Sequence, residues 1–370
     1  GSIWINGHFR DWKEVKIHVL NHGLHYGSCV FEGIRVYNKK IFKLYEHVSR
    51  LFYSAKKLDL NLDFSENQIC ECISNTVKRQ SINNGYIRPV IWRGSEKMAI
   101  SAVDSSINIA IAAWSWPSYF SPKKILEGIS MSTSKWRRPP PECAPTDSKA
   151  AGLYMICSLS KHEAEKNGFD DALMLDYRGY IAEATGANIF FVKDDSLFTP
   201  KADCFLNGIT RQVVIEIARN LKININEQFI KPDFIENCQE AFLTGTAVEI
   251  TPIKSIDDFS FSEREITIKL MDEFKKKHSD KCRLIGLDLG SKRIGVSICD
   301  EKQLIATPLK TINRNTINQL ISDLRSIIDE NNIKGIIIGN PLNMDGSSGR
   351  SAQSVKDTSQ KIEENINIPI

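Results

Sequence analysis

The chain has 370 residues, of which 42% are hydrophobic and 25% charged, a composition typical of a globular protein with room for two or three domains. Its net charge of +3 comes from basic residues spread along the chain, which argues against nucleic-acid or membrane partners and favours small-molecule chemistry. Nine scattered cysteines without a CxxC pair favour a reduced, cytoplasmic setting, and no apolar run is long enough to span a bilayer.

The first segment, to about residue 113, alternates short β-rich runs with two helical stretches. Helices are expected over 46–58 and 66–80, because apolar residues recur in the first at steps of three and four and form one face. The stretch AWSWPSYFSPKK (113–124), with its prolines and aromatic residues, predicts a loop between domains. Strands are expected at five runs: Ile3–Ile5, Val15–Val19, Ile34–Val36, Tyr86–Trp92 and Ile107–Ala112.

The second segment, 124–278, alternates strands with longer helices. In the helix expected over 210–221, Asn207, Gly208 and Thr210 are predicted to supply the turn and the cap. A helix start preceded by glycine offers free backbone amides, which bind phosphate well, although an ordinary capped helix has the same pattern. The other expected elements are strands at Ala172–Asp176, Ile189–Val192 and Ala241–Thr244 and helices over 149–167 and 262–277.

The character of the chain changes abruptly within 275–300, where a charged helix end is followed by a strand and a glycine turn. We therefore expect a domain junction near Ser279. The remainder predicts strands over 283–289, 294–299, 304–311 and 335–339, helices over 315–331 and 352–365, a loop over 340–352, and a strand that begins at Ile368.

Lys149 stands out in the stretch PTDSKAAGLY (145–154) because small and apolar residues follow it. A lysine in such surroundings is costly unless its amine is neutralised, paired or used covalently. On this stretch alone, the commoner explanation is a lysine whose amine reaches solvent.

Four blocks in the first three quarters of the chain put Lys149 in a different context. They are LHYGSCVFEGIRVY (24–37), YIRP (86–89), PTDSKAAGLY with GYIAEATGANIF (179–190), and NGITR (207–211) with GTAVEITP (245–252). In this order and spacing the blocks resemble the branched-chain amino acid aminotransferases of the fold-type-IV pyridoxal phosphate class. The resemblance implies a two-domain α/β (α+β) fold and pyridoxal 5′-phosphate as the cofactor.

By this resemblance, Lys149 forms the Schiff base with the cofactor and then carries a proton between the substrate α-carbon and the cofactor. Glu183 keeps the pyridine nitrogen protonated, which makes the ring an electron sink, and Tyr154 bonds to the ring hydroxyl. Without the resemblance, Glu183 is an ordinary turn carboxylate and Tyr154 a core aromatic residue. The phosphate is implied to contact Arg50, the backbone amides of Ile209 and Thr210, and Thr246.

The resemblance also implies a largely apolar substrate pocket with one reserved cation, because branched side chains and the γ-carboxylate of glutamate use one site in turn. Arg88 corresponds to the γ-carboxylate ligand, although an arginine before a proline at a strand end is commonly an edge residue that faces solvent. Arg93 and Ala99 stand where the family usually has an apolar residue and a glycine, which leaves the preference among valine, leucine and isoleucine open. The other implied substrate contacts are Tyr86, Thr246 and Ala247 at the α-carboxylate and the walls Tyr26, Phe31, Trp116 and Tyr154, with Ile100 and Tyr119 from the connecting loop or across a dimer.

The implied reaction exchanges an amino group between branched-chain amino acids and 2-oxoglutarate, which becomes glutamate, in a homodimer or a higher homo-oligomer. Two alternatives have the same fold, a D-amino acid aminotransferase and an aminodeoxychorismate lyase. The motifs FEGIR, YIRP and EITP favour the branched-chain enzyme over both. A third alternative is a nucleic-acid-processing protein to which the front part is ancillary.

The tail carries a second resemblance, in LIGLDLGSKRIGVSICD (284–300) and GNPLNMDGSSGRSA (339–352). These stretches resemble the RNase H-like family of Holliday junction resolvases and pre-ribosomal RNA nucleases. Asp288 corresponds to the first aspartate of that family's metal cluster, although it could instead cap a turn, and DLGSKRIG also occurs in actin-like ATPases. The family's further acidic residues would follow Ile368, so we expect an incomplete RNase H-like α/β domain without nuclease activity and no complete metal site.

The two resemblances together divide the chain into five parts. These are a small aminotransferase domain (1–116), an interdomain loop (117–123), a large cofactor-binding domain (124–278), a junction (279–282) and the RNase H-like part (283–370).

Overall fold

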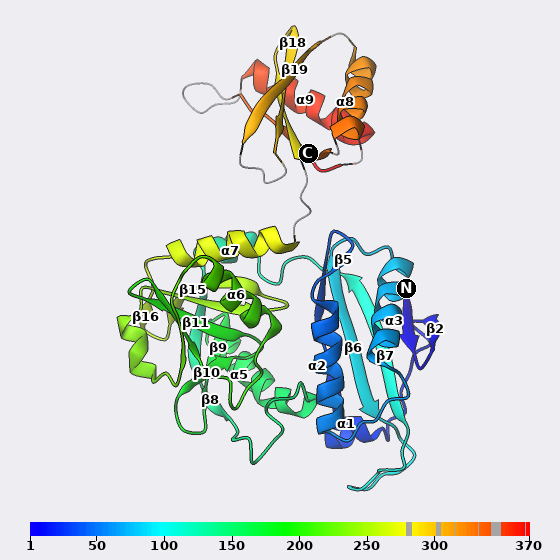
Figure 1. Ribbon diagram of the computed structural model, residues 1–370, viewed down its shortest axis with the longest axis vertical. Coiled ribbons are helices and arrows are strands. Elements are labelled where there is room, and N and C mark those ends of the chain that lie inside the picture. Colours follow the sequence, from blue (N-terminus) through cyan, green and yellow to red (C-terminus); the bar gives the residue numbers. More distant parts are fainter. Residues whose placement is uncertain (279–282, 301–304, 315, 332, 342–348, 367) are drawn as a thin grey trace. The chain divides into compact units, whose positions relative to one another are not determined.

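The computed structural model describes residues 1–278, 283–300, 305–314, 316–331, 333–341, 349–366 and 368–370 (Figure 1). The chain splits into two compact units, Gly1–His278 and Ser279–Ile370. The expected junction at 279–282 and most of the loop expected over 340–352 lie outside the described residues.

The first unit begins with a seven-stranded sheet in the order β2-β1-β7-β6-β4-β5, with β3 beside β6. Helices α2 (Leu44–Lys57) and α3 (Glu66–Arg79) pack against one another, and α3 also contacts β6 and β7. The helix α3 starts at a capping box, because the Ser65 hydroxyl accepts from the Gln68 amide while the Gln68 side chain accepts from the Ser65 amide. The other elements are β1 (Ser2–Ile5), β2 (His8–Asp11), α1 (His22–Tyr26), β3 (Cys29–Phe31), β4 (Ile34–Tyr37), β5 (Lys40–Ile41), β6 (Gly85–Arg93) and β7 (Ile107–Ser115).

The prediction of a strand at Val15–Val19 is wrong. These residues form turn and irregular backbone, and Val19 is 68% exposed. The strand β1 pairs antiparallel with β2, after a two-residue turn in which Asn6 and Gly7 both have positive φ, and also with β7. A β-branched run forms a strand only where a neighbouring strand is available to complete the ladder.

A nine-stranded sheet forms the larger part of the first unit, in the order β10-β9-β8-β15-β14-β11-β12-β13, with β16 beside β15. Its strands are β8 (Ile129–Arg138), β9 (Asp171–Asp176), β10 (Ile181–Ala184), β11 (Asn188–Lys193), β12 (Ser196–Pro200), β13 (Ile225–Gln228), β14 (Glu240–Gly245), β15 (Glu249–Ile256) and β16 (Phe259–Ser260). Its helices are α4 (Pro122–Glu127), α5 (Tyr154–Lys166), α6 (Ile209–Asn220) and α7 (Glu265–His278), with short 3₁₀ segments at Ala151–Leu153 and Pro232–Asn237.

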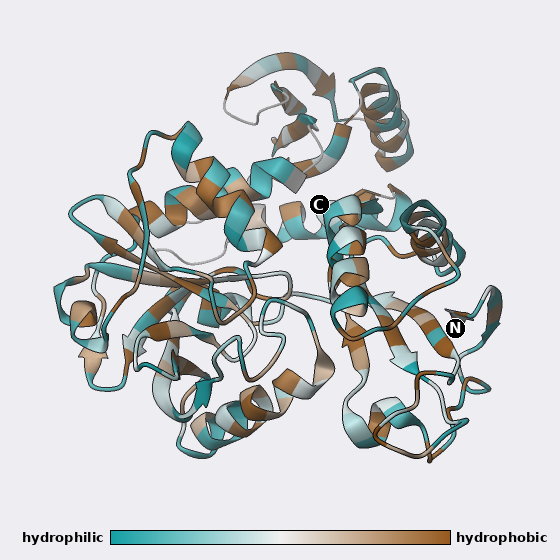
Figure 2. Cartoon of the chain, turned by 60° about the horizontal axis from the view of Figure 1, so that its bottom comes forward, coloured by the Kyte–Doolittle hydropathy of each residue, from teal (hydrophilic) through white to brown (hydrophobic). Residues whose placement is uncertain are grey.

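Both faces of this sheet are covered. Along β11, Ile189 and Phe191 join one apolar cluster, while Phe190 and Val192 join another that includes residues of α6 and α7. The helices carry hydrophobic and hydrophilic residues in turn along their length, as amphipathic helices on a sheet do (Figure 2). The strand β11 is therefore buried on both of its faces.

Two expected features of this part need correction. The helix expected from residue 149 starts at Tyr154, because the backbone of Lys149 and Ala150 instead contacts β3. Helix α6 has Gly208 as its N-cap and no side-chain cap, so the predicted cap chemistry of Asn207 and Thr210 is wrong. The Asn207 side chain accepts from the Arg211 guanidinium instead.

The second unit has a sheet in the order β19-β18-β17-β20 among its described residues, and one face of this sheet packs on two helices through a single apolar cluster. The expected strand at Ile368 is absent from the described residues, although the Ile336 amide donates to the Pro369 carbonyl at 2.9 Å. The elements are β17 (Arg283–Leu289), β18 (Arg293–Cys299), β19 (Ala306–Asn313), α8 (Ile317–Asn331), β20 (Ile333–Ile338) and α9 (Arg350–Asn365).

In the described ranges, none of the helices has the length and apolar character needed to cross a bilayer.

The apolar clusters of the two units have no residue in common. A chain that ends after His278 is therefore expected to fold by itself, with the midpoint of its main thermal transition within about 3 °C of that of the full chain. Circular dichroism of both chains during heating measures this. Loss of the cooperative transition in the shorter chain would contradict the independence of the first unit.

Candidate active site

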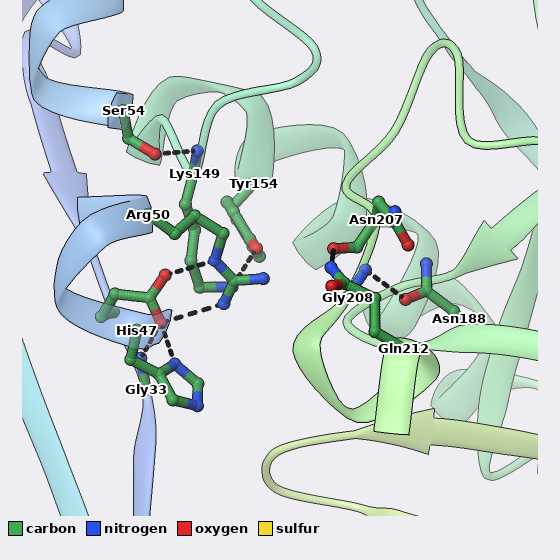
Figure 3. A network of polar contacts seen from close by, with 11 residues as sticks. Gly33, His47, Arg50, Ser54, Lys149, Tyr154, Asn188, Asn207, Gly208 and Gln212 are labelled. Atoms are coloured by element: carbon green, nitrogen blue, oxygen red, sulfur yellow. Dashed lines mark hydrogen bonds and ion pairs between the residues drawn. The ribbon is translucent and has the colours of Figure 1, made fainter. Parts of the chain in front are cut away.

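Lys149 lies where the two sheets of the first unit meet, and its backbone is held on both sides. Its amide donates to the Ser54 hydroxyl on α2 at 2.9 Å, and its carbonyl accepts from the Phe31 amide at 3.3 Å (Figure 3). The amine donates to the Tyr154 hydroxyl at 2.7 Å and lies 4.9 Å from the centre of the Phe31 ring. Burial lowers the pKa of the Lys149 amine, and the neighbouring Arg50 guanidinium lowers it further.

Beside Lys149, three polar side chains form a buried network (Figure 3). Arg50 donates to Glu32 from Nε at 2.6 Å and from Nη2 at 3.0 Å, and His47 Nδ1 bonds to the same carboxylate at 2.7 Å. Burial alone would raise the pKa of Glu32, but Arg50 and His47 outweigh it and hold the pKa far below its ordinary value. Glu32 is therefore ionised, and His47 must donate from Nδ1 because a carboxylate only accepts.

A second buried ion pair, Arg138 with Glu183, lines a cavity that Arg50 and Lys149 also line, called the first cavity below. Arg138 Nε lies 3.4 Å from Glu183 Oε1 and makes no hydrogen bond, and Asn188 Nδ2 donates to the other carboxylate oxygen at 3.4 Å. Burial raises the pKa of Glu183 to about 7, although Arg138 and Lys149 act in the opposite direction. The long, single contact with Arg138 therefore offsets the cost of burying the ionised Glu183 carboxylate only in part. The bidentate contact with Arg50 offsets the same cost for Glu32 much better.

The same cavity includes the start of α6. The Gly208 amide donates to the Asn188 side-chain oxygen at 3.1 Å, and a Cβ at Gly208 would come within 2.2 Å of that oxygen, so only glycine allows this approach. No side chain caps the helix, which leaves the amides of its first turn for a ligand. The Thr244 hydroxyl, on β14, is buried here without a partner.

These features describe a site for an anion that carries a polar ring. The Arg50 guanidinium, by the N–H groups that do not bond to Glu32, and the uncapped start of α6 could both bind the anion, because both favour negative charge. The partnerless Thr244 hydroxyl and the Arg138–Glu183 pair could form hydrogen bonds with the ring. Every residue expected to contact the cofactor lines this first cavity, namely Arg50, Lys149, Tyr154, Glu183, Ile209, Thr210 and Thr246.

A second cavity shares several lining residues with the first, Lys149, Tyr154, Thr185, Gly186 and Ala187, and five aromatic residues belong to its lining. Arg88 is its one arginine: Nη2 donates to the Tyr86 hydroxyl at 3.3 Å, and the guanidinium lies 4.6 Å from the centre of the Phe31 ring. Its Nε is buried without a partner. Of the residues expected at the substrate, Phe31, Tyr86, Arg88, Trp116, Tyr119, Tyr154 and Ala247 line this cavity.

Tyr26 lines neither cavity, because its ring packs on His22 at 4.6 Å between centroids and its side chain is 45% exposed. Ile100 is 82% exposed and also lines neither. Arg93, which departs from the family pattern, donates to the carbonyls of Asp59 and Ala102, so it fixes the backbone of the loop after β6.

The sequence interpretation missed several polar residues of the first cavity and its support: Glu32, His47, Arg138, Thr185, Asn188 and Thr244. A signal existed for His47, which lies three residues before Arg50 and so on the same side of α2. No comparable signal existed for Arg138, because its role depends on the meeting of the ends of β8 and β10.

Comparisons with known proteins agree with these features. Residues 29–256 match the family model of class IV aminotransferases, and residues 282–370 match that of a Holliday junction resolvase. The chain is 45% identical over 276 residues to a probable branched-chain-amino-acid aminotransferase of Rickettsia felis, an alignment that covers 74% of this chain and 94% of that protein. Identity to the branched-chain-amino-acid aminotransferase of Escherichia coli K12 is 37% over 267 residues, covering 70% and 86% of the two chains.

Solved structures of the same kind are similar to the first unit. The crystal structure of the E. coli branched-chain amino acid aminotransferase has a TM-score of 0.73 and 35% identity, over 75% of this chain and 94% of that chain. The T.th. branched-chain amino acid aminotransferase with pyridoxamine 5′-phosphate has a TM-score of 0.72 and 36% identity, over 75% of this chain and 93% of that chain.

The raised pKa of Glu183 predicts a pH-dependent cost of folding in the cofactor-free protein. Because folding raises the pKa of Glu183 from 4.5 to about 7, the contribution of this group to stability is fully present below pH 4.5, falls as the pH rises from 4.5 to 7, and stays low above pH 7. Glu183→Gln should lack this loss of roughly 3 kcal/mol, since each pKa unit corresponds to about 1.4 kcal/mol. Urea unfolding between pH 5 and pH 8 measures it, with the exposed Glu71→Gln as the control; parallel curves for the wild type and Glu183→Gln would contradict the assignment.

Proposed function

The chain belongs to the class IV aminotransferases, whose cofactor is pyridoxal 5′-phosphate, and from this we propose that it exchanges the amino group of leucine, isoleucine or valine with 2-oxoglutarate. The observation that carries the proposal is the Lys149 amine, which has a lowered pKa and lies between an anion-binding cavity and an aromatic cavity. The names of the relatives described above favour this substrate class over D-amino acids or aminodeoxychorismate.

The first cavity suits the cofactor from one end to the other. Arg50, Thr246 and the first amides of α6 would hold the phosphate, and the Tyr154 hydroxyl would bond to the ring hydroxyl. Burial raises the pKa of Tyr154, so this hydroxyl stays protonated and can donate. When bound, the cofactor supplies an aldehyde that reacts with an amine and a ring that withdraws electrons from the substrate α-carbon.

Lys149 is the proposed catalytic residue and the attachment point of the cofactor. Its lowered pKa keeps part of the amine neutral, and a neutral amine can both attack a carbonyl carbon and accept a proton. Its Nζ can then take the proton from the substrate α-carbon and return it one step later. Glu183 would hold a proton at the ring nitrogen, a role that its buried position beside Arg138 supports.

The second cavity accounts for a substrate pair with different side chains. Aromatic walls suit the branched aliphatic side chains, and Arg88 offers one cation with a partnerless Nε for the γ-carboxylate of glutamate or 2-oxoglutarate. The Tyr86 hydroxyl and the backbone at Thr246 and Ala247 would hold the α-carboxylate common to all substrates. One pocket could therefore accept both classes in turn.

We also propose a homo-oligomer. Several large apolar side chains of the segments 19–24 and 100–103 are exposed, with Val19 at 68%, Leu24 of α1 at 63%, Ile100 at 82% and Val103 at 73%. Exposed apolar side chains gathered in two segments favour a protein partner, and in the proposed assembly a second copy would bring the loop with Ile100 near a substrate cavity. Tyr26 belongs to the same exposed region, so its proposed substrate contact depends on this assembly.

The second unit does not change the proposal. Asp288 is exposed and is the one acidic residue among the described residues that line its neighbouring surface pocket. A two-metal nuclease mechanism needs several carboxylates at one point. Although residues 282–370 match a Holliday junction resolvase model, the described residues at this pocket do not make up a two-metal site.

Lys149→Ala should lower transamination by at least about 10²-fold, since general acid–base catalysis contributes factors of this order or more. Borohydride treatment should fix the cofactor to the wild-type protein at Lys149 and leave the variant unlabelled. Absorbance and peptide mass analysis measure the label. Lys56→Ala, at an exposed lysine of α2, is the control and should keep both label and activity. A label on another lysine of the wild type would refute the assignment.

Arg88→Leu should raise KM for glutamate and 2-oxoglutarate about 10- to 100-fold, because a hydrogen bond to a charged group is worth about 1.5–3 kcal/mol. KM for leucine should change far less, since leucine carries no γ-carboxylate to be left unpaired. Steady-state kinetics with both substrate pairs measures the difference, and leucine serves as the internal control. An equal effect on both pairs would mean that Arg88 is structural.

A further inference from the structure

We propose that Glu32 is a positioning residue for the phosphate end of the site. Its carboxylate fixes one edge of the Arg50 guanidinium and so aims the remaining N–H groups at the anion. The inference rests on the proposed function, in which Arg50 contacts the cofactor phosphate. It concerns a residue that contacts neither the cofactor nor the substrate and acts through Arg50.

The hydrogen bonds to Glu32 identify it as a fixed anchor. Its side chain is 0% exposed, and both oxygens accept: Oε1 from Arg50 Nε at 2.6 Å, and Oε2 from Arg50 Nη2 at 3.0 Å, His47 Nδ1 at 2.7 Å and the Gly33 amide at 3.1 Å. Four donors around one buried carboxylate leave no room for another orientation. Glu32 is thus an ionised group with a single position.

The anchor determines what Arg50 can offer to a ligand. A guanidinium has five N–H groups in one plane, and Glu32 uses the Nε proton and one Nη2 proton. Two protons on Nη1 and one on Nη2 remain, and Arg50 lines the first cavity together with the uncapped start of α6. A flexible arginine would lose side-chain entropy on binding the phosphate, whereas the paired one has already lost it.

The anchor also connects separate elements. Glu32 lies between β3 and β4, and its amide donates to the Pro89 carbonyl of β6 at 2.9 Å. His47 and Arg50 lie one turn apart on α2. The orientation of Arg50 therefore depends on the packing of α2 on the small sheet, which a surface arginine would not require.

A negative charge near a phosphate site also repels the phosphate, so the two roles of Glu32 predict opposite effects of its removal. If repulsion dominated, Glu32→Gln would tighten binding of the anion. If positioning dominates, Glu32→Gln weakens binding of the anion. Oε2 accepts three of the four hydrogen bonds, so the glutamine must place its oxygen at that position. Its NH₂ group then lies against the Arg50 Nε–H. Two donors then face one another, and the bidentate contact is lost.

The test compares two ligands, pyridoxal 5′-phosphate and pyridoxal, which differ only in the phosphate. The affinities of the cofactor-free full chain for both ligands are measured by fluorescence quenching. The affinity for pyridoxal 5′-phosphate divided by the affinity for pyridoxal is the ratio that reports the phosphate contact. We expect Arg50→Ala to lower the ratio by 10-fold or more and Glu32→Gln to lower it by about 10-fold, with the affinity for pyridoxal almost unchanged. The double variant should match Arg50→Ala, because Glu32 acts only through Arg50.

Controls separate positioning from folding. Glu46→Gln removes an exposed carboxylate of α2, whose partner is Lys43, and should leave the ratio unchanged. If Glu32→Gln fails to fold by circular dichroism, Glu32→Asp keeps the charge but shortens the side chain by one methylene, and it should lower the ratio in the same direction. A ratio that is unchanged or raised in the folded Glu32 variant, with the loss in Arg50→Ala intact, would overturn this inference alone. An unchanged ratio in Arg50→Ala would overturn the phosphate role of Arg50 and the inference together.

Discussion

The burial of charge around Lys149 is the constraint on which the site depends. Two carboxylates and two guanidiniums are buried in or directly behind the wall of the first cavity, and they pair as Glu32 with Arg50 and Glu183 with Arg138. The Lys149 amine forms no ion pair in the described structure and bonds to a neutral hydroxyl, so its desolvation outweighs the attraction of the more distant Glu32 carboxylate. Burial without a paired counter-charge lowers the pKa of an amine, and this favours the neutral form that the proposed role of Lys149 requires.

The geometry of the two ion pairs explains why similar residues behave differently. Glu32 receives a bidentate contact at 2.6 and 3.0 Å and two further donors, and its pKa falls despite complete burial. Glu183 has a cation at 3.4 Å and an amide at 3.4 Å, so burial dominates and its pKa rises to about 7. The first carboxylate is suited to a fixed anchor, and the second to sharing a proton with a bound ring.

Local patterns in the sequence predicted much of the fold but little of this electrostatic arrangement. The apolar face of α2 and the strands of β6, β9, β11 and β17 follow from period and composition, which are local properties. The strand β8 was missed because ISMSTSKWRR is polar, and it forms because β9 and β15 flank it. Resemblance to a family supplied Lys149 and Glu183, whereas Arg138 and Glu32 acquire their roles only where distant segments meet.

Two adjacent residues connect the halves of the site. Glu32 anchors Arg50 at the first cavity, and a Cβ at Gly33 would lie 1.7 Å from the hydroxyl oxygen of Tyr86 at the second cavity. Any side chain at Gly33 would displace Tyr86, whose hydroxyl also accepts from Arg88. The short segment between β3 and β4 therefore sets the positions of Arg50 and Tyr86, a proposed cofactor ligand and a proposed substrate ligand, at once. The glutamate holds Arg50 by its carboxylate, and the glycine leaves the space that the Tyr86 hydroxyl occupies.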